Sequence, residues 1–109
     1  MTTQADVDGF TREMVDRIAN RYQPLRIILF GSRGRGDATA ESDADLLVVM
    51  PDGCERHETA IQIGVALADL PLAKDIIVTT PSEIARRGHV VNTALRSALR
   101  EGRVVYERP

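Results

Sequence analysis

Apolar side chains recur at helical spacing near the start of the chain, and charged residues occupy most positions between them. The apolar positions are Val7, Phe10, Met14, Ile18 and Tyr22. This spacing predicts an amphipathic helix over about residues 5–21, which ends before Pro24. Further along, residues 26–30, 45–50 and 75–79 are nearly continuous apolar runs, and such runs predict three interior β-strands.

A helical pattern also lies between the second and third of these strands. After a turn at residues 51–53, residues 55–70 have the spacing of an amphipathic helix. Ile61, Val65 and Ala68 share one face of this helix, so we expect that face to be buried.

The last third of the chain begins with a helix start signal. Residues 80–83 read Thr-Pro-Ser-Glu, a capping box that predicts a short helix as far as Arg87. A second helical stretch should end at Gly102, before a last strand at residues 103–106. The expected buried stripe of that stretch is Val91, Leu95 and Leu99. Together these elements predict one small α/β (α+β) domain over residues 1–109, with a mixed sheet of about four strands and helices mainly on one face.

Net charge, cysteine count and the length of apolar runs exclude several classes of partner and metal site. The net charge of −2 argues against a broad basic face, so no direct nucleic-acid partner is expected. Cys54 is the only cysteine, which excludes an intrachain disulfide and any multi-cysteine metal site. The chain shows neither a leader-like start nor an apolar run long enough to span a bilayer. We therefore expect a cytoplasmic protein with no membrane partner.

The first strand leads into a glycine-rich loop, residues 31–36. A P-loop would need Lys-Ser or Lys-Thr after the glycines, and the dinucleotide fingerprint needs a different glycine spacing, so both are excluded. Gly31-Ser32 by itself is often only a turn. Alternatively, its backbone amides, the Ser32 hydroxyl and the guanidinium groups of Arg33 and Arg35 could hold a triphosphate tail. For both arginines, plain solvent exposure is an equal alternative.

Three aspartates follow this loop. Asp43 and Asp45 alternate at the start of the second strand, so their side chains can share a face. Asp75 opens the third strand, and the three carboxylates would cluster if these strands are neighbours. Aspartate pairs often only cap turns. A cluster of three repels strongly unless cations neutralise it, and oxygen-only ligands favour Mg²⁺ or Mn²⁺, including the metal pair of phosphoryl transfer.

These residues also form a recognisable motif. Gly31-Ser32, ten further residues and Asp43-Ala44-Asp45 match the Gly-Ser, ten-residue, Asp-x-Asp pattern of minimal nucleotidyltransferases. The chain thus resembles the MNT type of the polymerase beta superfamily over nearly its whole length. Members of that family carry a third acidic residue at the start of a later strand, and Asp75 is in such a position here. One departure is Gly34, where relatives often carry alanine, and we expect it only to loosen the loop.

The resemblance implies a polymerase-beta-like nucleotidyltransferase fold and a role for each motif residue. Gly31 and Ser32 would bind the triphosphate of ATP, and Asp43 and Asp45 would hold two Mg²⁺ ions. Asp75 would contact the metal that activates the acceptor hydroxyl, so all three acids would be both catalytic residues and metal ligands. Further candidate nucleotide contacts are Arg33, Arg35 and Ser42.

Short MNT proteins resemble the antitoxin of HEPN/MNT toxin-antitoxin pairs, which transfers AMP to a tyrosine of a helical HEPN ribonuclease. A HEPN-type partner is therefore the first hypothesis. The second is nucleotidyl transfer to a small hydroxylated molecule, which requires a deep pocket or a homo-oligomer that completes one. The third is a non-catalytic antitoxin that only binds its partner, although three clustered acids argue against it. The sequence leaves open the acceptor, the preferred base and the oligomeric state.

Overall fold

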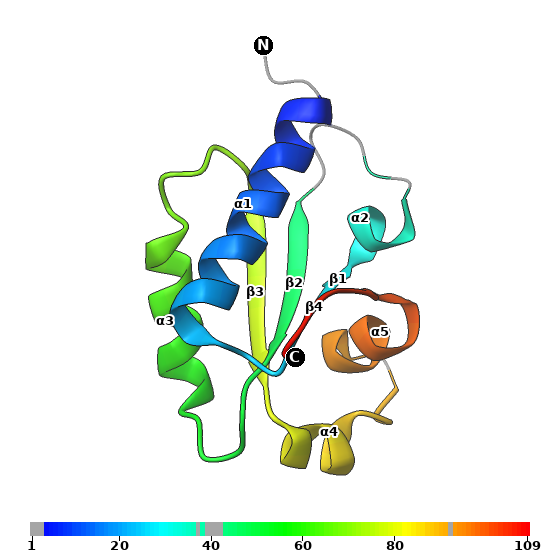
Figure 1. Ribbon diagram of the computed structural model, residues 1–109. Helices are drawn as coiled ribbons and strands as arrows, with labels where there is room; N and C mark the ends of the chain where they lie inside the picture. Colours follow the sequence, from blue (N-terminus) through cyan, green and yellow to red (C-terminus); the bar gives the residue numbers. More distant parts are fainter. Residues whose placement is uncertain (1–3, 37, 39–42, 92) are drawn as a thin grey trace.

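The computed structural model describes residues 4–36, 38, 43–91 and 93–109. It shows a four-stranded sheet with helices packed against it (Figure 1). The helices are α1 (Gln4–Tyr22), α2 (Gly31–Arg35), α3 (Arg56–Ala66), α4 (Pro81–Arg87) and α5 (Ala94–Glu101). The strands are β1 (Arg26–Phe30), β2 (Ala44–Val49), β3 (Lys74–Thr79) and β4 (Arg103–Glu107). In the part of the chain that is described, no helix is long and apolar enough to cross a membrane.

The sheet is mixed, in the order β3-β2-β1-β4. β1 pairs antiparallel with both β2 and β4, whereas β2 and β3 run parallel. The parallel pair requires a crossover, and α3 supplies it on one face of the sheet. The predicted mixed α/β fold with four strands is therefore confirmed.

Both faces of the sheet are covered. The two longest helices, α1 and α3, pack on one face, and α5 packs on the other (Figure 1). The core on the α1 face includes Met14, Ile18, Leu46, Val48, Ile63 and Leu67. The core on the α5 face consists of Ile28, Phe30, Leu47 and Ala98. Strands covered on both faces must be apolar at successive positions, which explains the continuous runs in β1 and β2.

The structure reverses the predicted orientation of α3. Ile61 and Val65 were expected to be buried, but they are 50% and 73% exposed, whereas Ile63 and Leu67 are fully buried. Ala68 was assigned to the same buried face, yet it is exposed and lies beyond the end of the helix. Two apolar pairs with four-residue spacing lie on different sides of this helix, and periodicity alone does not rank them. The packing of α3 against the sheet and α1 selects the second pair.

This orientation predicts unequal effects of two matched substitutions. Ile63→Ala should lower the free energy of unfolding by about 2 to 5 kcal/mol, because it empties a closed core site. Ile61→Ala removes the same atoms from a half-exposed position and should cost less than about 1 kcal/mol. Urea unfolding followed by circular dichroism measures both values. Equal losses for the two variants would contradict the observed helix orientation.

The caps of the last two helices decide where they begin. Thr80 accepts a hydrogen bond from the Glu83 N–H at 3.3 Å, so the predicted capping residue of α4 is confirmed. The Glu83 carboxylate accepts a hydrogen bond from the Thr79 hydroxyl and pairs with Arg56, rather than completing the capping box. Thr93 caps α5, so Val91 precedes this helix and is 61% exposed. The prediction that Val91 is buried was wrong, because the cap lies after it.

Candidate active site

Strand pairing places two of the three candidate acids side by side. β2 and β3 are parallel neighbours, and Asp45 is the register partner of Asp75. Register partners on adjacent strands have Cα atoms about 4.8 Å apart and project their side chains from the same face. Asp45 also pairs with Phe30 of β1, whose side chain belongs to the core on the α5 face. Asp45 and Asp75 therefore lie on the α5 face, where β2 and β3 begin.

The electrostatics of this corner centre on Asp45. Burial raises the pKa of its carboxyl above the ordinary value, and the negative charges of Asp75 and Asp43 raise it further. Asp43 and Asp75 themselves are exposed. Each of these carboxylates disfavours the ionised form of Asp45, which is the condition that a hard cation relieves.

The donor chemistry of these acids fits Mg²⁺, because all the oxygens are carboxylate oxygens. Among the residues that the structure describes, no three histidine, cysteine or acidic side chains form a group that could already hold a metal ion. Asp45 and Asp75 thus provide an adjacent pair, and Asp43 influences that pair through its charge. The assignment of all three as metal ligands stays a prediction.

The glycine-rich segment lies directly against Asp45. Residues Gly31–Arg35, expected to be a loop, form the short helix α2. Gly31 begins this helix with φ +68°, and a Cβ atom there would lie 2.3 Å from Asp45 Oδ2. Gly36 ends it with φ +85° and donates its N–H to the Ser32 carbonyl at 3.0 Å. Only glycine meets both conditions at position 31, a left-handed backbone and contact with a carboxylate.

The structure gives a reason why position 34 must be glycine, which the sequence did not indicate. A Cβ atom at this position would lie 2.4 Å from the Leu29 carbonyl oxygen and would also approach the backbone of Gly102. Backbone atoms cannot move aside as side chains can. Gly34 therefore lets α2 pack closely on β1, and the expectation that it only loosens the loop was wrong.

The two arginines of α2 have different environments. Arg33 is only 6% exposed, and its Nη1 lies 3.8 Å from Asp8 Oδ1 of α1, so solvent exposure was the wrong alternative for it. Arg33 follows Gly31 by two residues, or about 200° around a helix, which turns its side chain away from Asp45. Arg35 is exposed. Phosphate contact remains a prediction for both arginines, and Ser42 lies outside the described residues.

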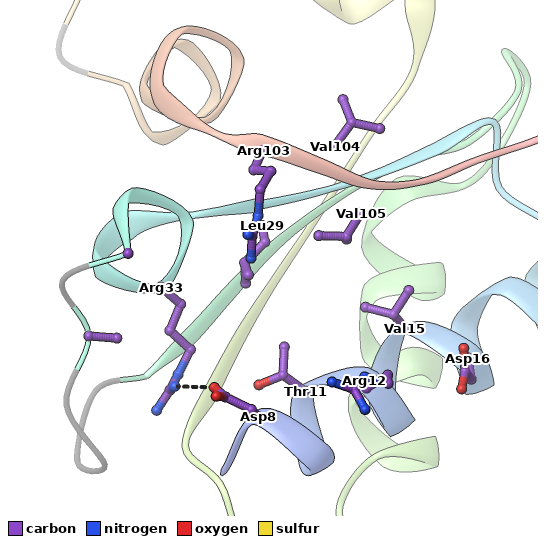
Figure 2. A pocket seen from close by; sticks show the side chains of 12 residues that line it. Asp8, Thr11, Arg12, Val15, Asp16, Leu29, Arg33, Arg103, Val104 and Val105 are labelled. Carbon is purple, nitrogen blue, oxygen red and sulfur yellow. Dashed lines mark ion pairs between the residues drawn. The ribbon is translucent and has the colours of Figure 1, made fainter. Parts of the chain in front are cut away.

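Asp8 was not found from the sequence. It occupies one of many polar positions on α1, and no spacing relates it to the motif of residues 31–45. Its contact with Arg33 becomes visible only when α1 is placed against α2 (Figure 2).

Comparisons with known proteins show the family and the fold of this chain. The family described as "Nucleotidyltransferase domain" matches residues 11–105. A protein of Methanocaldococcus jannaschii named "Putative protein adenylyltransferase" is 34% identical over 97 residues, which cover 87% of this chain and 93% of that protein. A crystal structure of a "putative nucleotidyltransferase" from Sulfolobus solfataricus superposes with a TM-score of 0.63. That alignment covers 92% of this chain and 79% of the other at 22% identity, and it supports the predicted fold.

The family match spans α2, all three aspartates, strands β1 to β3 and the first part of β4. The motif of residues 31–45 and the contact between Gly31 and Asp45 lie inside it. The chain therefore belongs to the nucleotidyltransferase domain family and is a nucleotidyltransferase.

Proposed function

We propose that this protein transfers AMP from ATP to a hydroxyl side chain of a protein partner in a Mg²⁺-dependent reaction. The observation that carries the proposal is the contact between the Gly31 turn and the Asp45 carboxylate, with Asp75 in register beside it. This contact brings a candidate triphosphate-binding turn next to candidate metal ligands. The M. jannaschii relative, named for protein adenylylation, supports a protein as the acceptor.

Each part of the site has a role in this reaction. Backbone N–H groups of the Gly31 turn and the Ser32 hydroxyl orient the triphosphate. Asp43, Asp45 and Asp75 would hold Mg²⁺, which supplies charge neutralisation and a more acidic acceptor hydroxyl. The acceptor hydroxyl gives up its proton to water and its oxygen forms a bond to the α-phosphorus. The bond from that phosphorus to the bridging oxygen of the β-phosphate breaks, and pyrophosphate leaves with the electron pair of that bond. Positioning by the turn supplies much of the remaining rate enhancement.

The group that accepts AMP must reach the end of the sheet where β2 and β3 begin. Asp43 and Asp75 are both exposed, so the end of the sheet that carries the acids faces solvent. An exposed site suits a side chain presented by another protein better than a small molecule that must be enclosed. We propose a helical HEPN-type toxin as this partner and AMP transfer to its tyrosine as the antitoxin activity.

The proposal is tested by mixing the protein with a candidate HEPN partner, ATP and Mg²⁺, and measuring the intact mass of the partner. We expect the wild type to add the mass of AMP residues to the partner and to silence it. The variant Asp43→Ala, in which an exposed side chain is shortened, should add none. Aminoglycoside-like alcohols in parallel reactions test the small-molecule alternative, and we expect little turnover with them.

Two outcomes would contradict this proposal. An unchanged partner mass, together with equal neutralisation by wild type and Asp43→Ala, would show a binding antitoxin rather than an enzyme. Rapid turnover on small alcohols with no modification of any partner would show the small-molecule transferase instead.

A further inference from the structure

The short helix α2 contacts structures on both faces of the sheet. Gly31, at its start, lies against the Asp45 carboxylate on the α5 face. Arg33 extends the other way, to Asp8 of α1 on the opposite face (Figure 2). A helix of five residues is too short to be stable alone, so tertiary contacts must hold α2 in place. The same contacts then hold the turn at Gly31 and Ser32, with which the helix begins.

Two different contacts hold α2. At Gly34 the helix lies so close to β1 that a Cβ atom would be 2.4 Å from the Leu29 carbonyl oxygen. Glycine has no side chain to interlock with a neighbour, so this contact sets the distance to β1 but resists sliding or rotation of α2 only weakly. Among the five residues of α2, all of which the structure describes, only Arg33 is buried. Its long side chain is the group that can fix the rotation of the helix.

The burial of Arg33 makes its charge depend on nearby acceptors. Its side chain is 3% exposed, and its Nη1 lies 3.8 Å from Oδ1 of Asp8, a side chain that is 59% exposed. A guanidinium removed from water is costly unless an opposite charge or hydrogen bonds compensate it. Without the Asp8 charge, the guanidinium would gain free energy by moving toward solvent. The backbone would follow, and Ser32 is the neighbouring residue.

We propose that Arg33 is a positioning residue, which acts through Asp8 to keep the Gly31-Ser32 turn against Asp45 in the arrangement that receives the triphosphate. Arg33 does not touch the phosphates in this role, because it follows Gly31 by about 200° around the helix and points toward α1. The proposal rests on the proposed function, since it takes this turn to be the triphosphate-binding element. It adds α1 to the elements that shape the active site.

The test measures MgATP binding by isothermal titration, with no acceptor present, at a temperature where every variant is folded. Asp8→Asn and Arg33→Gln should each weaken binding about tenfold. The double variant should bind no more weakly than the weaker single variant, because both changes break one contact. Asp8→Glu keeps the charge and should restore most of the affinity. Asp16→Asn, at a second exposed aspartate of α1, is the matched control and should bind as the wild type does.

A second measurement follows the helix itself without nucleotide. The Gly36 N–H donates to the Ser32 carbonyl at 3.0 Å, so its hydrogen exchange reports whether α2 stays formed and in place. In Asp8→Asn this amide should exchange about tenfold faster, whereas the amide of Leu47, a fully buried residue of β2, should be unaffected. If Arg33→Gln does not fold, Asp8→Asn and Asp8→Glu still decide the result, because the Asp8 side chain is mostly exposed.

Wild-type affinity of Asp8→Asn for MgATP would overturn the positioning role, even if its melting temperature falls. Weaker binding by Arg33→Gln alone would then identify Arg33 as a phosphate ligand. Unchanged exchange at Gly36 in Asp8→Asn would also contradict the proposal. Neither measurement uses an acceptor, so a failure to modify a partner protein leaves both results intact. A wild type that binds no MgATP would contradict the proposed donor, and the exchange at Gly36 would then decide the role of Arg33.

Discussion

Asp45→Asn should abolish nucleotidyl transfer, by at least about a thousandfold, and should raise the melting temperature at pH 7 in metal-free buffer. Activity is lost because the half-buried carboxylate that contacts the Gly31 turn can no longer bind a cation with Asp75. Stability rises because asparagine has nearly the same shape but carries no charge. Burial and the charges of Asp75 and Asp43 disfavour the ionised form of Asp45 in the folded protein.

The pH dependence of this gain has a definite sign. The pKa of Asp45 is raised above its ordinary value of 3.8 in the folded state, so ionisation of this carboxyl costs the folded protein free energy. That cost is absent at low pH, appears as the pH rises through 3.8, and is complete above the folded pKa. The melting-temperature advantage of Asp45→Asn should therefore be present at pH 7, shrink on acidification and vanish below about pH 3.8.

Thermal unfolding of wild type and Asp45→Asn across this pH range, together with a transfer assay, measures both effects. Asp43→Asn is the matched control for stability, because its side chain is exposed and should change the melting temperature less. A lower melting temperature of Asp45→Asn at pH 7, or transfer at the wild-type rate, would show that Asp45 is neither electrostatically strained nor catalytic.

Gly31→Ala should lower transfer roughly a hundredfold and lower the free energy of unfolding by about 1 to 2 kcal/mol. Two effects combine at this position. The backbone angle φ of +68° disfavours any residue with a Cβ atom, and that atom would lie 2.3 Å from Asp45 Oδ2. The Asp45 carboxylate must move to relieve the clash. This movement takes the carboxylate away from its place beside Asp75 and the Gly31 turn.

Gly53→Ala separates these two effects. Gly53 has φ +92°, but no atom lies within 4 Å of the position its Cβ would occupy, and it is in the turn after β2, away from the acids. This variant should lose a similar amount of stability and keep its transfer rate. Urea unfolding and initial transfer rates of the two variants are the measurements. If both variants transfer AMP equally well, the contact between Gly31 and Asp45 does not matter for catalysis.

Much of the secondary structure follows from local signals. β1 has the predicted bounds, because its apolar run ends sharply at Gly31. The start of α4 follows from Thr80 and Pro81, which act on the backbone of the next few residues. Such signals work over one turn of helix or a few residues of strand, so a single sequence is enough to read them.

Local patterns were insufficient where an element has more than one acceptable orientation. α3 carries apolar residues on two sides, and the sheet and α1 choose Ile63 and Leu67 over Ile61 and Val65. The short helix α2 was missed because two of its five residues, Gly31 and Gly34, are glycines, which have low helix propensity. Its formation depends on close packing against β1, where Gly34 meets the Leu29 carbonyl.

The sequence by itself determined the strands, the Thr80 cap of α4 and the spacing between Gly31-Ser32 and the Asp43-Ala44-Asp45 motif, since these depend on neighbouring residues. Only the tertiary structure decided that β3 lies parallel to β2, which sets Asp75 beside Asp45. It also decided that the Arg33 side chain turns toward Asp8 of α1 and away from Asp45 in the candidate active site. These arrangements depend on contacts between residues distant in the chain, and the burial of both sheet faces selects them.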